Sequence, residues 1–127
     1  MGNPLFIFIL SFISITAYSK TYNVTLVRVI DGDTAVFEVD LGFNLKMTDH
    51  FRFLNVDTCE MRASDPRERE RAKLEKLFVE NKMNNAHNII IESNSRGKYG
   101  RWLADIYVDG SYLNAEVEKY HQELEPK

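Results

Sequence analysis

The feature that most constrains the fold is a turn signal between two strand-like segments. Apolar and polar residues alternate along Tyr22 to Ile30 and again along Thr34 to Leu41, and the dipeptide Asp31-Gly32 lies between them. Alternation with a period of two is typical of a strand with one buried face, and a DG dipeptide between two such segments is a strong hairpin signal. We therefore expect the fold to begin with two antiparallel strands.

Three further strands are predicted beyond this hairpin. After a turn at 42–46, the segment 46–56 has the composition of a third strand. The segment 88–93, which contains three consecutive isoleucines, is typical of a short buried strand. A glycine-punctuated loop at 94–100 then leads to a fifth predicted strand at 101–108.

Two helices are predicted, one between the third and fourth strands and one after the fifth. Asp65 can act as an N-cap, with Pro66 at the first helical position and Glu68 three residues after the cap. The apolar face expected on this first helix is Leu74, Leu77 and Phe78, while Ala72, Val79 and Met83 drift to another side. The second helix is predicted from the near-helical spacing of Leu113, Val117, Tyr120 and Leu124.

This order of elements favours one fold class. Three strands, a helix, two strands and a helix is the order of a five-stranded OB-type barrel, which makes the expected fold mainly β within the α+β class. A mixed α+β sandwich with the same order is the alternative. With 127 residues, of which 44% are hydrophobic, the chain has material for one globular domain.

The first nineteen residues have the features of an export signal. They carry no charge, and their apolar run from Leu5 to about Ile15 is too short to span a bilayer. Ala17 and Ser19 supply small residues for signal peptidase, so we expect a signal peptide at 1–19, a mature domain at 20–127, and a secreted or extracytoplasmic protein. Because no Lys or Arg precedes the apolar run, an uncleaved membrane tether and a misassigned start codon stay open.

Net charge and cysteine content limit the functions available. A formal net charge of -3 argues against a protein that coats nucleic acid by bulk attraction, so a polyanion must be bound by a local cluster. A single cysteine, Cys59, excludes an intrachain disulfide. Because His50, His87 and His121 are isolated in the sequence, a zinc site is not expected.

Two aspartates are placed where they could meet. Asp33 begins the second predicted strand and Asp57 ends the third, and these two points can be neighbours in a closed barrel. Two carboxylates this close repel each other, and a hard divalent cation is the usual remedy. The sequence therefore indicates a calcium or magnesium site, although each acidic residue alone could belong to a solvated barrel rim.

Basic residues could complete a phosphate-binding site. Arg52 lies within the third predicted strand, and Lys98, Tyr99 and Arg101 lie in or beside the glycine-punctuated loop. A guanidinium group matches phosphate oxygens bidentately, so these residues beside a metal would suit a phosphate, whereas a basic loop alone is usually only solvated. A regular strand would put Arg52 and Asp57 on opposite faces, so the strand must end or bulge between them if both serve one site.

Three separated motifs make the chain resemble the staphylococcal nuclease (thermonuclease) family: IDGDT at 30–34, FRFLNVDTCE at 51–60 and KYGRWLADIYVDG at 98–110. They occur in the family's order, and the resemblance covers roughly residues 20 to 120. It implies an OB-fold and a calcium-dependent endonuclease, and the export signal expected at 1–19 would make this a secreted enzyme. Such an enzyme hydrolyses phosphodiester bonds of DNA and RNA to give 3′-phosphate ends. No stable protein partner is implied, so we expect a monomer.

The resemblance also implies roles for individual residues. Asp33 and Asp57 match the family's calcium carboxylates, and Thr58 matches the residue that binds calcium through its backbone carbonyl. Glu60 matches the carboxylate that orients or deprotonates the attacking water. The remaining matches are the two arginines that bind the scissile phosphate, the lysine and tyrosine beside the nucleotide, and a secondary acidic residue near the metal: Arg52, Arg101, Lys98, Tyr99 and Asp31.

The sequence also departs from the family. Cys59 stands where the family usually has proline, and the sequence ends at Lys127, before the family's last helix and its second nucleotide-side tyrosine. The acidic composition predicts weaker and more salt-sensitive substrate capture. Two other functions therefore stay open: a non-catalytic OB-fold module that binds nucleic acid or protein, and an exported barrel that binds calcium only for stability.

Overall fold

The computed structural model describes residues 2–5, 7, 9, 11, 13 and 20–127. The predicted signal peptide at 1–19, with its cleavage site at 17–19, lies for the most part outside these residues. Within the described part of the chain, no helix is long and apolar enough to cross a membrane.

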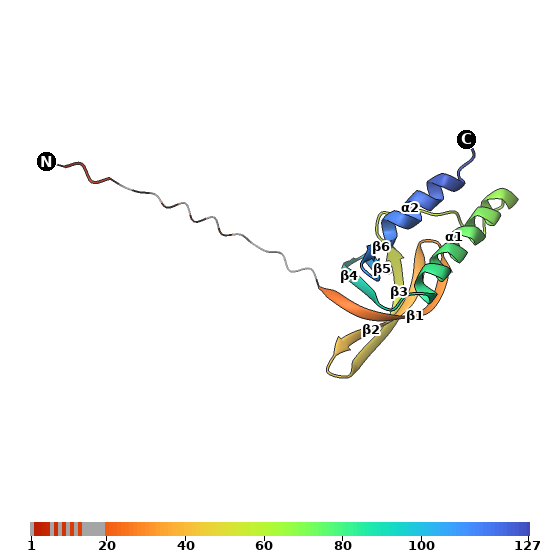
Figure 1. Ribbon diagram of the computed structural model, residues 1–127, viewed down its shortest axis with the longest axis horizontal. Helices are drawn as coiled ribbons and strands as arrows, with labels where there is room; N and C mark the ends of the chain where they lie inside the picture. Colours follow the sequence, from red (N-terminus) through yellow and green to blue (C-terminus); the bar gives the residue numbers. More distant parts are fainter. Residues whose placement is uncertain (1, 6, 8, 10, 12, 14–19) are drawn as a thin grey trace.

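The strands form a closed barrel, as predicted (Figure 1). In sheet order β3-β2-β1-β4-β5, each strand pairs antiparallel with its neighbour, and a parallel pairing of β3 with β5 closes the sheet. The strands are β1 (Thr21–Asp31), β2 (Thr34–Gly42), β3 (Leu45–Phe53), β4 (Ile89–Arg96) and β5 (Trp102–Val108). A two-residue strand not predicted from the sequence, β6 (Ser111–Tyr112), pairs with β5.

The two predicted turns between the first three strands are present. Gly32 and Asp33 join β1 to β2, and the β2–β3 turn places Gly42, Phe43 and Asn44 at positive φ. Gly32 does not have a positive φ, so the backbone conformation alone does not require glycine at this position. A Cβ there would lie 2.9 Å from the Glu75 Cβ and 2.9 Å from the Thr58 Cγ2, so close packing requires glycine in this turn.

Large apolar side chains fill the barrel. Phe37 and Phe51 pack with their ring centroids 5.7 Å apart, and both are almost completely buried. The other large, fully buried apolar side chains are Phe53, Ile91, Ile106, Leu113, Val39, Val79 and Val117. Because side chains alternate along a strand, the inner faces of the strands supply most of this core, and Val79, Leu113 and Val117 add to it from the helices.

The first helix, α1 (Pro66–Asn84), begins as predicted, because the Asp65 side chain accepts a hydrogen bond from the Arg67 backbone N–H. The predicted apolar face was wrong for Leu74 and Leu77, whereas Phe78 is partly buried against the core as expected. Leu74 and Leu77 are 43% and 51% exposed, and the residues buried against the barrel are Ala72, Glu75, Val79 and Met83. The buried face includes a glutamate, so it does not look apolar in the sequence.

The second helix, α2 (Leu113–Leu124), lies beside α1 (Figure 1). The rings of Phe78 and Tyr120 stack at 4.5 Å, and Lys82 pairs with Glu116 at 2.9 Å. Leu113 and Val117 are buried as predicted. The buried Asn114 anchors the start of α2: its carbonyl accepts from the Ile106 N–H, and its amide donates to the Leu54 and Ala104 carbonyls.

The third strand is shorter than predicted. β3 ends at Phe53, and Asn55 has φ of 59° in the turn that follows. Asp57 therefore lies beyond the strand, which removes the expected conflict between its face and that of Arg52. The segment from Leu54 to Asp65 joins β3 to α1 and contains Asp57 and Glu60.

Candidate active site

A pocket of about 470 Å³ opens where the β1–β2 turn meets the end of β3 and the segment that follows it. Seven of the residues singled out in the sequence line this pocket: Asp31, Asp33, Arg52, Asp57, Thr58, Glu60 and Arg101. They come from three separate segments of the chain. Barrel closure brings them together, since Thr34 pairs with Arg52 across β2 and β3, and Arg52 pairs with Leu103 across β3 and β5.

Asp33 is the buried carboxylate of the pocket, with 7% of its surface exposed. Its Oδ2 accepts hydrogen bonds of 3.1 Å from both the backbone N–H and the hydroxyl of Thr58. Its Oδ1 accepts a hydrogen bond of 2.9 Å from the Thr34 hydroxyl. The backbone carbonyl of Asp33 also accepts from the Phe53 N–H at 2.8 Å, which ties the start of β2 to the end of β3.

Arg52 links the two aspartates. Its Nη1 lies 3.3 Å from Asp33 Oδ2, and its Nη2 lies 3.4 Å from Asp57 Oδ1. Nη1 also donates to backbone carbonyls, including that of Val56. Because the Asp57 side chain is 96% exposed while that of Arg52 is 21% exposed, Arg52 is the fixed member of this pair.

Three further charged residues line the pocket. Arg101 donates a hydrogen bond of 3.4 Å to the Thr34 hydroxyl, and among the described residues it forms no salt bridge. Glu60 is exposed in the segment between β3 and α1. Arg62 also lines the pocket, but it was not predicted as a site residue from the sequence. Its position two residues after Glu60 was the only sequence feature that could have indicated it.

Lys98 and Tyr99 lie outside the pocket lining. Both belong to the β4–β5 loop, Tyr99 is 79% exposed, and the Lys98 Nζ lies 6.0 Å from the Tyr99 ring centroid. The loop joins the pocket only through Arg101, which directly precedes β5. These two side chains are therefore available to a ligand that extends beyond the pocket, but they do not help to form it.

The two aspartates of the β1–β2 turn have opposite pKa shifts. Burial and the neighbouring Asp33 carboxyl raise the pKa of Asp31 to about 7. Burial also acts to raise the pKa of Asp33, but a hydrogen bond from Asp31, the charge of Arg52 and the donors of Thr58 and Thr34 outweigh it and hold the pKa below its usual value. In the absence of a cation, Asp31 therefore holds a proton to a higher pH than an ordinary aspartate, and Asp33 is the carboxyl that ionises first.

The donor set of the pocket fits a hard divalent cation. It offers the carboxylates of Asp33 and Asp57 and the backbone carbonyl of Thr58, and all three residues line the pocket. Oxygen donors suit calcium or magnesium, and a cation would relieve the repulsion between adjacent carboxylates. Asp33, Asp57 and Thr58 are thus the residues of this pocket that could hold a hard metal ion.

Comparison with known proteins agrees with this arrangement. The family model described as staphylococcal nuclease homologue matches residues 50–120, more than half of the chain. The chain belongs to this nuclease family. The match begins after the β1–β2 turn, so Asp33 is placed beside the matched residues by the structure rather than by the family model.

A curated relative, Endonuclease YncB of Bacillus subtilis (strain 168), is 38% identical over 107 residues. The alignment covers 79% of this chain and 46% of the relative, so the chain spans about half the length of the curated relative it matches. The family and the relative's printed name both describe nucleases, and the pocket residues from Arg52 to Arg101 lie within the range that the family model matches.

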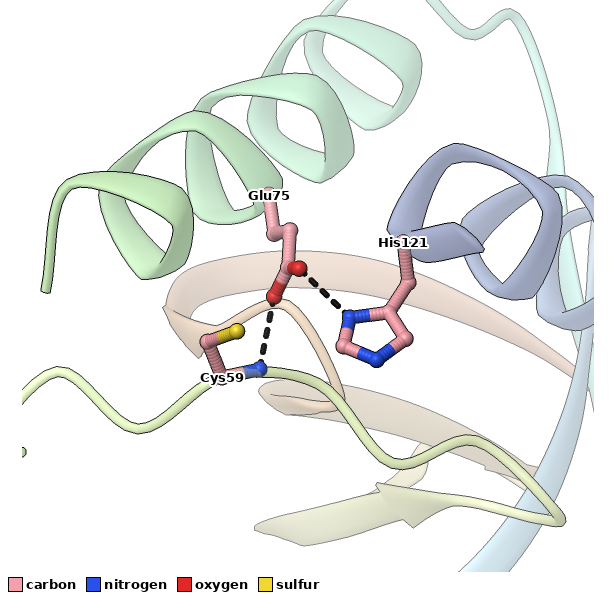
Figure 2. Close-up of side chains that lie close together, drawn as sticks. All are labelled: Cys59, Glu75 and His121. Carbon is pink, nitrogen blue, oxygen red and sulfur yellow. Dashed lines mark hydrogen bonds and ion pairs between the residues drawn. The ribbon is translucent and has the colours of Figure 1, made fainter. Parts of the chain in front are cut away.

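One feature of this family member was missed in the sequence. Cys59, in place of the family's usual proline, lies beside Glu75 of α1 and His121 of α2 (Figure 2). Glu75 Oε2 accepts a hydrogen bond of 2.8 Å from the Cys59 N–H, and Glu75 Oε1 lies 2.7 Å from His121 Nδ1. The expectation that His121 is isolated was therefore wrong. Tertiary packing joins three residues that lie far apart in the sequence.

The surroundings of Cys59 do not favour a nucleophilic thiolate. Cys59 is buried, and burial together with the negative charge of Glu75 raises the pKa of its thiol to about 11. A thiol with this pKa is protonated near neutral pH, and nucleophilic chemistry requires the thiolate. Its backbone has a structural role instead, because the N–H bond to Glu75 fixes the segment between Thr58 and Glu60 against α1.

Proposed function

We propose that the chain is a calcium-dependent endonuclease that hydrolyses phosphodiester bonds of DNA and RNA and leaves 3′-phosphate ends. One observation carries this proposal: residues from three separate family motifs line a single pocket that contains both oxygen donors for a cation and guanidinium groups for a phosphate. Membership of the staphylococcal nuclease family supports it.

The arginines supply the phosphate site in this proposal. Arg101 makes one weak hydrogen bond and no salt bridge within the described residues, so its guanidinium group is available to the scissile phosphate. Arg52 is held by backbone carbonyls and the two aspartates, so it presents a fixed positive charge. Both groups stabilise negative charge that develops on the phosphoryl oxygens in the transition state.

Glu60 is the general base of the proposed reaction. It is exposed and lines the same pocket, so an attacking water can be hydrogen-bonded to its carboxylate. Proton transfer to a positioned carboxylate contributes roughly 10²–10⁴-fold to a hydrolytic rate. Glu60 thus accepts the proton of the water while the arginines hold the phosphate.

The proposed calcium ligands are Asp33, Asp57 and the backbone carbonyl of Thr58. When bound, calcium would polarise a phosphoryl oxygen and help to place the water. The Thr58 bonds to Asp33 orient this carboxylate in advance, because both donors contact its Oδ2. Arg52 forms ion pairs with both carboxylates and offsets part of their negative charge.

The substrate is an extended polynucleotide rather than a small phosphate ester. Lys98 and Tyr99 lie outside the pocket, where they can contact nucleotides flanking the cleaved bond. The net charge of -3 makes binding depend on this local cluster, so substrate capture weakens as salt rises. We also propose that the enzyme is exported by its N-terminal segment and acts as a monomer.

One assay tests this function. Purified protein is incubated with supercoiled plasmid and, separately, with single-stranded RNA, with calcium and then with excess chelator. We expect degradation of both substrates that needs calcium, and fragment ends that only a phosphatase makes extendable by a DNA polymerase. The chelated sample and a heat-inactivated sample are the controls.

The two other candidate functions give different results in the same assay. A gel shift of the nucleic acid without cutting would replace the enzyme by a binding module. Neither cutting nor a shift, with calcium still raising the melting temperature, would leave only a calcium-stabilised barrel. Degradation that persists in chelator would contradict the calcium dependence but not the nuclease activity.

A further inference from the structure

The side chains of Cys59, Glu75 and His121 form a compact cluster beside the active-site pocket (Figure 2). One potential ligand atom of each residue, namely a sulfur, a carboxylate oxygen and a ring nitrogen, lies within 4.8 Å of the other two. Glu75 is fully buried and Cys59 is 7% exposed. Three different ligand types thus converge from the segment after β3 and from both helices.

We propose that Cys59, Glu75 and His121 form a binding site for a zinc ion, distinct from the calcium site. Sulfur, nitrogen and oxygen donors are the ligands that Zn²⁺ prefers, whereas calcium takes oxygen donors only. Three protein ligands leave a fourth tetrahedral position for water. The proposal does not depend on nuclease activity.

The distances are compatible with a tetrahedral ion. Zinc bonds of about 2.0–2.3 Å place ligand atoms roughly 3.3–3.7 Å apart. The ring nitrogen of His121 and the nearer oxygen of Glu75 are 2.7 Å apart, and the three ligand atoms span up to 4.8 Å. Shifts of about 1 Å therefore convert the cluster into a metal site, and side-chain rotation can supply them.

Hydrogen bonds around the cluster already orient two of the ligands. Glu75 Oε2 accepts from the Cys59 N–H, which leaves Oε1 free to exchange its His121 hydrogen bond for a metal bond. On the other side of the ring, His121 Nε2 lies 3.5 Å from the Glu125 carboxylate. A carboxylate on the second ring nitrogen is the usual outer partner of a zinc-bound histidine, because it fixes the tautomer.

Charge balance also favours a divalent ion. A thiolate and a carboxylate together carry two negative charges, which Zn²⁺ neutralises, while the imidazole ligand is neutral. The occupied site is therefore neutral overall in a buried position, where an uncompensated charge is strongly unfavourable. Zinc displaces the thiol proton, which is released to solvent, and replaces the hydrogen bond between Glu75 and His121 Nδ1, while the neutral imidazole keeps its proton on Nε2.

Because of the position of Cys59, zinc bound at the proposed site would also stabilise the segment beside the active-site pocket. Cys59 lies between Thr58, which orients Asp33, and Glu60, which lines the active-site pocket. A metal bond at Cys59 would join this segment to α1 and α2 together, in addition to the existing N–H bond to Glu75. Zinc should therefore stabilise the fold at the edge of the active site.

Binding of cobalt(II), a spectroscopic substitute for zinc, tests the proposal on the full chain with calcium present in saturating amounts. We expect one cobalt ion per chain, a thiolate-to-cobalt charge-transfer band, and loss of this band on adding zinc. A hundredfold excess of zinc over its Kd should raise the melting temperature by roughly 10 °C.

Matched variants locate the ion. Cys59→Ser should abolish the charge-transfer band, and Glu75→Gln and His121→Gln should each weaken cobalt binding at least tenfold. His87→Gln, which changes an exposed histidine outside the cluster, should leave binding unchanged. Circular dichroism of each variant separates loss of binding from loss of folding, and three independent variants keep the test decisive if one of them does not fold.

Two results would overturn the zinc site. One is the absence of zinc or cobalt binding to the folded protein at millimolar metal. The other is a bound cobalt ion that lacks the sulfur band and persists in Cys59→Ser and His121→Gln, which would place the ion among carboxylates elsewhere.

Discussion

Thr58 donates two hydrogen bonds of 3.1 Å to one oxygen of Asp33, from its backbone N–H and from its hydroxyl, across 25 residues of sequence. This contact fixes the β1–β2 turn to the segment that follows β3. It therefore connects the two halves of the proposed calcium site, and the orientation of the buried carboxylate depends on it.

Thr58→Val removes the hydroxyl bond and keeps the backbone bond and the side-chain shape. We expect calcium affinity to fall about tenfold, because an outer hydrogen bond to a metal-binding carboxylate is lost. The free energy of unfolding should decrease by about 1–2 kcal/mol. Calorimetric calcium titration and denaturant unfolding measure the two effects, and Thr48→Val on the exposed part of β3 is the control. Unchanged calcium affinity would show that the Thr58 hydroxyl does not orient Asp33 for calcium.

Glu60→Gln tests the proposed base. The amide cannot accept the proton of the attacking water, so we expect turnover to fall by about 10²–10⁴-fold while calcium and nucleotide binding are retained. Steady-state kinetics and equilibrium binding of a nucleotide separate these effects. Glu70→Gln, on the exposed side of α1, should keep full activity. Equal activity in Glu60→Gln would show that another group activates the water.

Arg101→Lys tests whether the phosphate is bound by a planar fork. A lysine keeps the positive charge but cannot make two parallel hydrogen bonds, so we expect kcat/KM to fall about 10- to 100-fold. Arg67→Lys, on the exposed first turn of α1, is the control for a general effect of the exchange. Unchanged kcat/KM would mean that Arg101 acts only as a point charge.

The barrel could be predicted from the sequence because its signals are local. Apolar and polar residues alternate over Tyr22 to Ile30 and Thr34 to Leu41 because successive side chains lie on opposite faces of a strand. The turn and cap residues likewise determine the backbone conformation only within a few positions. Once the order of elements is set, barrel closure brings Asp33 beside Arg52, which also contacts Asp57. The meeting of these site residues in one pocket could therefore be predicted from the strand order.

The burial of α1 could not be predicted in the same way. A prediction from periodicity assumes that the buried face of a helix is apolar, and it therefore selects the face with Leu74 and Leu77. The face that is buried in the structure contains Glu75 instead. A buried carboxylate is tolerated only when it has partners, and here these are the Cys59 N–H and His121. Neither partner is close to Glu75 in the sequence, so no local pattern reveals the exception.

Gly32→Ala tests the contact between the turn and α1. The added Cβ would lie 2.9 Å from both the Glu75 Cβ and the Thr58 Cγ2, which are short, constrained parts of their side chains. We expect a loss of about 1–3 kcal/mol in the free energy of unfolding, together with weaker calcium binding as Thr58 moves away from Asp33. Gly97→Ala, whose Cβ would meet the flexible end of Leu103 at 3.2 Å, should destabilise the protein less. Equal stability of Gly32→Ala and the wild type would contradict this packing.

The pairing of His121 with Glu75 should make stability depend on pH in the metal-free protein. Burial lowers the pKa of His121, but the hydrogen bond and negative charge of Glu75, with the charges of Glu118 and Glu125, outweigh it and raise the pKa above its usual value. The folded state therefore binds the imidazole proton more tightly than the unfolded state does. The resulting stabilisation is complete below the unfolded pKa of about 6.5 and is lost as the pH rises through the higher folded pKa.

The measurement is urea unfolding of the wild type and of His121→Gln, in chelator, between about pH 5.5 and 9. The difference in unfolding free energy between the two proteins should be largest at the acidic end and should shrink toward the alkaline end. His87→Gln supplies the control, because His87 is exposed and its side chain lies outside the cluster. A difference that stays constant across this range, or grows with pH, would show that His121 does not take up a proton against Glu75 on folding.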